Sequence, residues 1–136
     1  MDITSLYPGI EGAKRGIAIV DDKYVVVQDE FITGDKESLL RWTMLTSSDV
    51  KVRRNTAELL KDGQKLIIQV KGIKGVRMRT WSTVSPNDYD EDNEGTTLIG
   101  FEVKLPAKTR TNLLVELLPD GDKNYKTRRI KELNEW

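Results

Sequence analysis

The residues best suited to bind an anionic ligand lie in one short stretch, where Arg77, Arg79 and Trp81 occupy alternate positions. Alternate residues of a β-strand point to the same face, so the pattern predicts two guanidiniums beside one indole. A guanidinium donates to carboxylate or sulfate oxygens, and an indole offers a flat apolar surface to a sugar ring. With Tyr89 in the following loop, these residues form a candidate glycan-binding site. The same pattern also suits packing against another domain, or arginines that cover an exposed tryptophan by cation–π contact.

An acidic loop follows this stretch, and its Asp88, Asp90 and Asp92 have the alternate spacing of a calcium-binding loop. Carboxylate oxygens are the ligands that calcium prefers. The helix-loop-helix calcium motif is nevertheless absent, because Asn93 stands where that motif has Gly and Ile99 stands where it has the bidentate Glu. A solvated acidic loop is the favoured interpretation, and the three aspartates form only a weak calcium candidate.

The side chains that most often carry out catalysis are missing, because the 136 residues include no His and no Cys. Any chemistry would fall to carboxylates, Tyr, Lys, Arg or a hydroxyl. The neighbouring acids Asp29 and Glu30 lie in a predicted strand and therefore point to opposite faces, so they cannot act as a catalytic pair. We expect a supporting or binding domain with no catalytic residue and no cofactor.

The charges are balanced, with 22 basic and 22 acidic residues, so no overall field would collect nucleic acid or an anionic membrane. We therefore expect neither as a partner. No apolar stretch approaches the ~18 residues of a membrane span, and the amino terminus lacks the features of a secretory signal. Two small basic clusters could contact an anionic chain, although charges at strand edges more often prevent aggregation; they are Lys51, Arg53 and Arg54, and Arg128, Arg129 and Lys131.

Short apolar runs that alternate with polar residues dominate the chain and predict β-strands. Two hairpins are expected, one turning at residues 21–23 and one at residues 61–64, and residues 84–95 form the longest predicted loop. Trp42, Met44 and Phe101 sit in alternating runs and are predicted to be core residues. The tail from residue 125 to 136 is expected to be extended with one final turn. Eight or so short strands predict an all-β fold, a single antiparallel β-sandwich with a jelly-roll-like or similar two-sheet arrangement, as one domain over residues 1–136.

Several short segments, in their order and spacing, resemble the carboxy-terminal β-sandwich of heparinase II/III-like polysaccharide lyases. Each string is short, and together they cover nearly the whole chain. They are residues 2–8 (DITSLYP), 14–17 (KRGI), 26–30 (VVQDE), 41–46 (RWTMLT), 55–59 (NTAEL), the turn at Gly63, and residues 80–83 (TWST), 87–90 (NDYD), 95–102 (GTTLIGFE) and 114–119 (LVELLP).

The resemblance implies a secreted or periplasmic enzyme of acidic-polysaccharide degradation, in which a helical toroid and a central sheet domain hold the catalytic groups. This chain would be a non-catalytic accessory sandwich, with those domains as partners in cis or in trans and an acidic polysaccharide as a further contact. No catalytic residue is carried over to this chain. One alternative is a stand-alone carbohydrate-binding module for anionic glycans, and another is a small hydrolase or lyase that uses Tyr, Lys and carboxylates.

Overall fold

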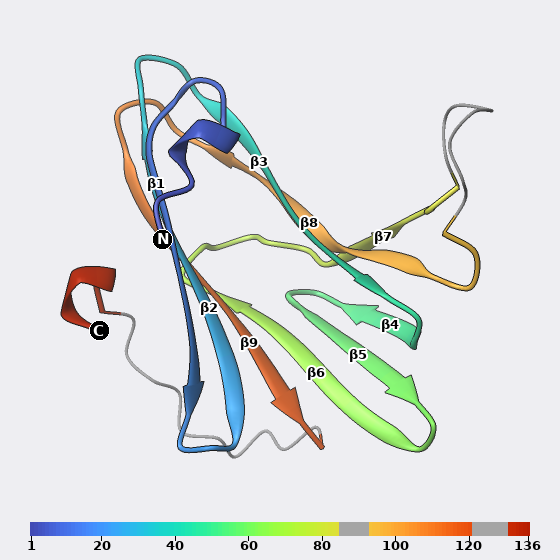
Figure 1. Cartoon of the computed structure of the whole chain (residues 1–136). Helices are drawn as coiled ribbons and strands as arrows, with labels where there is room; N and C mark the ends of the chain where they lie inside the picture. Colours follow the sequence, from blue (N-terminus) through green and yellow to red (C-terminus); the bar gives the residue numbers. More distant parts are fainter. Residues whose placement is uncertain (85–92, 121–130) are drawn as a thin grey trace.

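The computed structural model describes residues 1–84, 93–120 and 131–136. Nine strands and two short 3-10 turns make up this part of the chain (Figure 1). The elements are η1 (Thr4–Leu6), β1 (Ile10–Val20), β2 (Tyr24–Thr33), β3 (Ser38–Thr46), β4 (Asp49–Arg53), β5 (Thr56–Lys61), β6 (Gln64–Lys71), β7 (Arg79–Trp81), β8 (Thr97–Leu105), β9 (Arg110–Pro119) and η2 (Leu133–Glu135).

Both predicted hairpins are present. Strands β1 and β2 turn at Asp21 and Asp22, which both adopt positive φ, and β5 and β6 turn at Asp62 and Gly63, which do the same. Left-handed residues give a tight turn the twist that its flanking strands need, and Asp and Gly tolerate that conformation best. The turn chemistry read from the sequence therefore sets the register of both hairpins.

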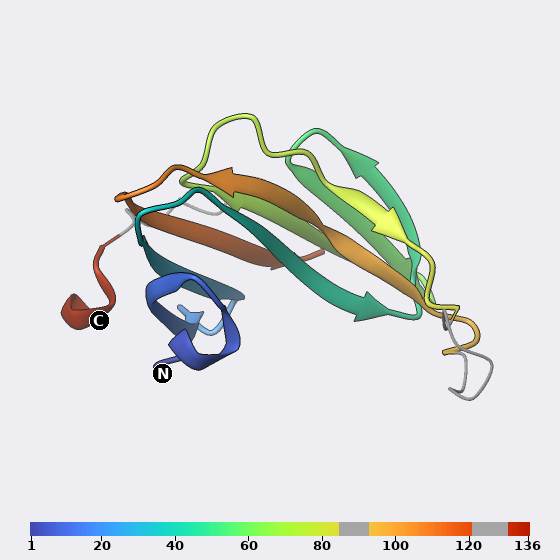
Figure 2. The same ribbon diagram turned by 90° about the horizontal axis from the view of Figure 1, so that it is seen from above.

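The strands form two antiparallel sheets that face one another (Figures 1 and 2). The larger sheet has the order β1-β2-β9-β6-β5-β4, and the smaller has the order β3-β8-β7. Strand β9 lies between β2 and β6 and joins the two hairpin units into one sheet. The predicted all-β fold with a two-sheet antiparallel arrangement is thus confirmed, and the sheets do not close into a barrel.

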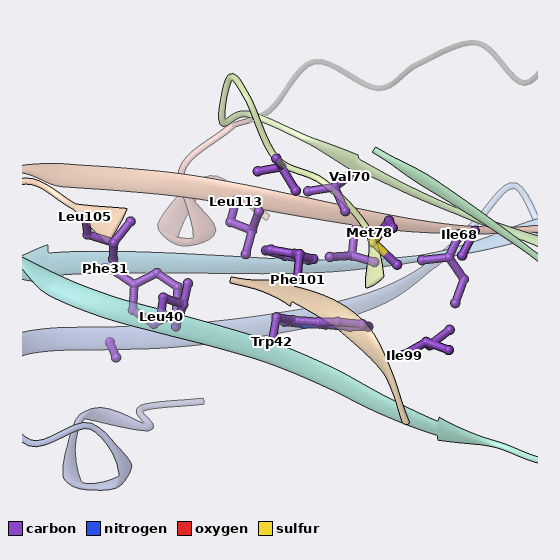
Figure 3. Packing of buried hydrophobic residues seen from close by; sticks show 14 of the residues in the cluster. Phe31, Leu40, Trp42, Ile68, Val70, Met78, Ile99, Phe101, Leu105 and Leu113 are labelled. Carbon is purple, nitrogen blue, oxygen red and sulfur yellow. The ribbon is translucent and has the colours of Figure 1, made fainter. Parts of the chain in front are cut away.

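The core lies between the two sheets, and the predicted core aromatics are at its centre (Figure 3). Trp42 of β3 and Phe101 of β8 are direct cross-strand partners, and their rings stack with centroids 5.8 Å apart and planes 8° apart. Met44 packs against the same cluster but is only partly buried. The alternation seen in the sequence therefore points these residues inward as expected.

The carboxy-terminal turn covers part of the outer face of the larger sheet. The Gln28 side chain donates to the carbonyl of Lys131 over 2.5 Å, and the Leu133 amide donates to a Glu30 carboxylate oxygen over 2.6 Å. At Gly16 an added Cβ would lie 2.4 Å from a methyl carbon of Leu133, so glycine leaves room for this turn. The predicted final turn is present as η2, and residues 121–130 lie outside the described part of the chain.

No helix in the described ranges is long and apolar enough to cross a membrane.

Candidate functional site

The smaller sheet brings together a cluster of arginines around Trp81 on its outer face. Strand β7 pairs with β8, so that Arg79 lies opposite Gly100 and Trp81 lies opposite Leu98. On the other side of β8, Arg41 of β3 lies opposite Glu102. Strand β8 therefore connects the residues that come from β7 with those that come from β3, which is far from β7 in the sequence.

Two guanidiniums lie over the ring of Trp81. The guanidinium carbon of Arg41 is 5.2 Å from the ring centroid, and that of Arg79 is 5.3 Å from it. Both distances are within the range of favourable cation–π contact. The Arg41 and Arg79 side chains are 55% and 57% exposed, so an anion in solvent can still reach both cations.

The Glu102 carboxylate accepts hydrogen bonds from both arginines. One carboxylate oxygen accepts from Nε of Arg41 over 2.7 Å, and the other accepts from Nη1 of Arg79 over 3.2 Å. One carboxylate compensates two guanidiniums, so the cluster of Arg41, Arg79, Trp81 and Glu102, hereafter the Trp81 cluster, keeps an excess positive charge. Such a cluster can bind a carboxylate or a sulfate through the guanidinium N–H groups that remain.

The structure brings together only some of the residues predicted for this site. Arg79 and Trp81 are in contact, as the alternation predicts. Arg77 is exposed in the segment that precedes β7, and the second guanidinium over the ring belongs to Arg41 instead. Tyr89 lies outside the described residues, and so do Asp88, Asp90 and Asp92 of the weak calcium candidate. Within the described ranges, no group of three or more acidic side chains is arranged to hold a metal ion.

Sequence reasoning missed Arg41 and Glu102, although each carries a signal. Each lies between two inward-facing residues of an alternating run, which predicts an outward side chain. What the sequence could not supply is the pairing of β3 with β8 across more than fifty residues, because register between distant strands is set by packing of the whole core.

The neighbouring acids of β2 do point to opposite faces. Asp29 pairs with Arg15 on the inner face of the larger sheet, whereas Glu30 bonds to Gln28 and to the carboxy-terminal turn on the outer face. Each carboxylate is occupied by a structural partner, so this finding supports the interpretation that they do not form a catalytic pair.

Comparison with solved structures identifies proteins with the same arrangement of strands. A heparinase III gene product superposes with a TM-score of 0.64 at 19% sequence identity over 90% of this chain, and a crystal structure of heparinase III gives 0.64 at 17% identity over 89%. A heparinase III gene product with methylated lysines gives 0.63 at 20% identity over 96%. The chain has a heparinase-like fold. No protein-family model and no curated protein matches the sequence.

The heparinase-like fold accounts for only part of those larger proteins. This chain spans between 19% and 22% of the length of the three solved chains. At these identities the likeness establishes the fold and not the activity.

Proposed function

We propose that this chain is a non-catalytic accessory β-sandwich of a heparinase-like polysaccharide lyase that acts on acidic polysaccharides. The observation that carries the proposal is the superposition of 90% of the chain on one fifth of a heparinase III structure. A sandwich of this size would stabilise the geometry of neighbouring catalytic domains and leave the reaction to them.

The residue inventory supports a non-catalytic role. Abstraction of the proton beside a uronate carboxylate needs a positioned base, and His, the most common one, is absent from the chain. The buried carboxylates Asp29 and Glu116 are each ion-paired with a cation, Arg15 and Lys71 respectively. The charges of both acids are therefore compensated within the fold.

An exposed apolar area on the inner face of the larger sheet supports a scaffold role. Ile17 and Ile19 of β1 are 63% and 70% exposed, and their cross-strand partners Val27 and Val25 are half-buried. Figure 1 shows β3 and β8 running away from this end of β1 and β2, so the smaller sheet leaves it uncovered. Apolar side chains gathered on one face of a sheet fit packing against another domain.

The proposal is tested with the purified chain and with its genomic neighbourhood. The chain alone, incubated with heparan sulfate or alginate, should release no unsaturated uronic products detectable by absorbance; sustained release would overturn the proposal. The adjoining coding sequence should encode a helical toroid and a central sheet domain, and deletion of residues 1–136 from that polypeptide should lower its lyase activity and thermal midpoint. A neighbourhood without lyase segments would contradict the proposal.

A stand-alone module for anionic glycans is the second candidate, and the Trp81 cluster favours it. The cluster offers two exposed guanidiniums and an indole, a combination that suits an acidic sugar. Saturable millimolar or tighter binding of heparin, heparan sulfate or alginate fragments, lost on Trp81→Ala, would favour this candidate over the scaffold.

We also propose a periplasmic or secreted location, in keeping with the heparinase-like fold. Fractionation of cells that produce the native gene product would test it, and recovery in the cytosol would contradict it.

A further inference from the structure

A second polar surface lies on the outer face of the larger sheet, on a different sheet from the Trp81 cluster. It is a groove of about 570 Å³ that crosses β9, β6, β5 and β4. Figure 1 shows these four strands side by side in the right-hand part of the larger sheet. The residues that argue for its role are Glu116, Gln69, Thr56 and Arg53 in one row and Leu118 and Ile67 in the next.

The first row crosses four strands without interruption. Glu116 of β9 lies opposite Gln69 of β6, Gln69 lies opposite Thr56 of β5, and Thr56 lies opposite Arg53 of β4. Neighbouring strands are ~4.8 Å apart, so three such steps extend over roughly 14 Å. A row of this length can follow a short oligosaccharide, with a carboxylate at one end and a guanidinium at the other.

Apolar side chains line the groove beside this row. Leu118 and Ile67 are direct cross-strand partners. Ile67 in turn lies opposite Glu58, and Glu58 lies opposite Lys51, so these four residues form a second row beside the first. Leu118 and Ile67 are only 3% and 8% exposed, so they form the floor of the groove, and the contacts with a ligand come from the polar side chains.

The charges of the groove leave two cations for an incoming anion. Glu116 pairs with Lys71 over 2.7 Å, and Glu58 pairs with Lys65 over 3.2 Å, so both carboxylates are already compensated. Lys51 and Arg53 are exposed and have no ion-pair partner within residues 1–84, 93–120 and 131–136. Both belong to β4, the edge strand, where an extended ligand can leave the groove.

At the opposite end of the row of Glu116, Gln69, Thr56 and Arg53, one oxygen of Glu116 lacks a hydrogen-bond donor within the described part of the chain. Glu116 is 2% exposed, and its Oε1 atom has no hydrogen-bond partner among the residues that the structure describes. Buried polar atoms are nearly always hydrogen-bonded, and an unpaired carboxylate oxygen at a groove calls for a hydroxyl or an amine.

We propose that this groove binds an acidic oligosaccharide. Sugar hydroxyls donate to Glu116 and bond to Gln69, and a carboxylate or sulfate pairs with Lys51 and Arg53. The inference rests on the proposed function for the choice of an acidic glycan, whereas the groove itself calls for a polyhydroxylated anion. It gives the sandwich a glycan contact of its own, independent of the Trp81 cluster.

The test compares two double variants of the full chain that each remove two exposed cations. Lys51→Ala/Arg53→Ala changes the groove, and Lys104→Ala/Lys108→Ala is the matched control, because these lysines are 74% and 75% exposed and lie outside both candidate sites. An alginate tetrasaccharide and a neutral cellotetraose are titrated against each protein by calorimetry. The groove variant should raise the Kd for the alginate tetrasaccharide by about tenfold or more, because it removes two charge-assisted hydrogen bonds, and the control should change it by less than about twofold.

A second variant tests the end of the row near Glu116. Gln69→Ala, at the position paired with Glu116, should weaken binding of the alginate tetrasaccharide severalfold in protein whose thermal midpoint shows that it is folded, because it removes an amide that bonds to a sugar hydroxyl without changing the charge of the groove.

Three results would overturn the groove as a glycan site. These are equal affinity for cellotetraose, loss of binding in the control alone, or greater aggregation of the groove variant at unchanged Kd, as expected if Lys51 and Arg53 only protect a sheet edge. Absence of any saccharide binding would also overturn it. That last result would leave the scaffold proposal intact, since it is tested by the genomic neighbourhood and by deletion of the domain.

Discussion

Arg15 of β1 and Asp29 of β2 are direct cross-strand partners that form a bidentate ion pair on the inner face of the larger sheet, with Nε–Oδ1 at 2.6 Å and Nη2–Oδ2 at 2.7 Å. The Asp29 side chain is 1% exposed and that of Arg15 is 28% exposed. The hydrogen bonds that Arg15 donates to the Asp29 carboxylate raise the pKa of Arg15 above its ordinary value, although burial opposes the shift. The guanidinium therefore compensates a carboxylate that water cannot reach.

Arg15→Met should lower the free energy of unfolding by about 2–4 kcal/mol, because it leaves Asp29 buried without its cation. Urea unfolding measures the change. The double variant Arg15→Met/Asp29→Leu is the control and should recover part of the loss, since neither charge is then buried. A double variant less stable than the single one would show that the pair itself, and not the uncompensated carboxylate, carries the energy.

Gly100 allows β3 and β8 to approach closely. An added Cβ would lie 1.9 Å from the carbonyl oxygen of Trp42 and 2.9 Å from Cα of Thr43, both backbone atoms that cannot move away cheaply. Gly100→Ala should therefore cost more than about 3 kcal/mol. Gly75→Ala is the matched control, because Gly75 has a φ of +76° and no atom within 4 Å, and it should cost only about 1 kcal/mol. Equal losses in thermal unfolding would contradict the close approach.

The exposed apolar area on β1 offers a direct test of domain packing. Ile17→Lys/Ile19→Lys should change the stability of the isolated chain by about 0.5 kcal/mol or less, because both side chains are already largely in solvent. In the full polypeptide the same change should lower the thermal midpoint and lyase activity, since lysines would be buried against the neighbouring domain. Leu39→Lys, at a side chain 63% exposed on the smaller sheet, serves as the control. Loss of activity with Leu39→Lys alone would place the contact on the other sheet.

Glu102 should limit the affinity of the Trp81 cluster for anions. Glu102→Gln removes the carboxylate that occupies Arg41 and Arg79, so sulfate or a sulfated disaccharide should bind severalfold more tightly. Stability should fall by only about 1 kcal/mol, because both ion pairs are exposed. Tryptophan fluorescence follows the binding, with Trp81→Phe to identify the responding ring. Unchanged or weaker binding would show that the two arginines are not available to anions.

Hydrogen bonds to the Asp2 carboxylate near the amino terminus should make the stability of the chain depend on pH in the acidic range. The Asp2 carboxylate accepts from Oγ1 of Thr4 over 2.7 Å and from the Thr4 amide over 2.9 Å, and these bonds lower the pKa of Asp2 below its ordinary value of 3.8. A lowered pKa stabilises the folded chain above the unfolded-state value, and the contribution disappears as the pH falls through the lower folded-state pKa. NMR titration should give a midpoint below 3.8, and Thr4→Val should move it upward. A midpoint at or above 3.8 in the native sequence would contradict the contact.

The sequence by itself determined the all-β character, two hairpin turns and the inward direction of several side chains, because alternation and turn chemistry act between neighbours along the chain. Trp42 and Phe101 each reached the core for that local reason. It also predicted the contact of Arg79 with Trp81, two residues apart on one face.

Only the tertiary structure decided which distant strands became neighbours. Packing of the core placed β9 between β2 and β6 and brought β3 beside β8, and no local pattern encodes those choices. For this reason the second guanidinium at Trp81 comes from Arg41 and not from Arg77. The row of Glu116, Gln69, Thr56 and Arg53 has the same origin, because its four members belong to four strands that meet only when the larger sheet is complete.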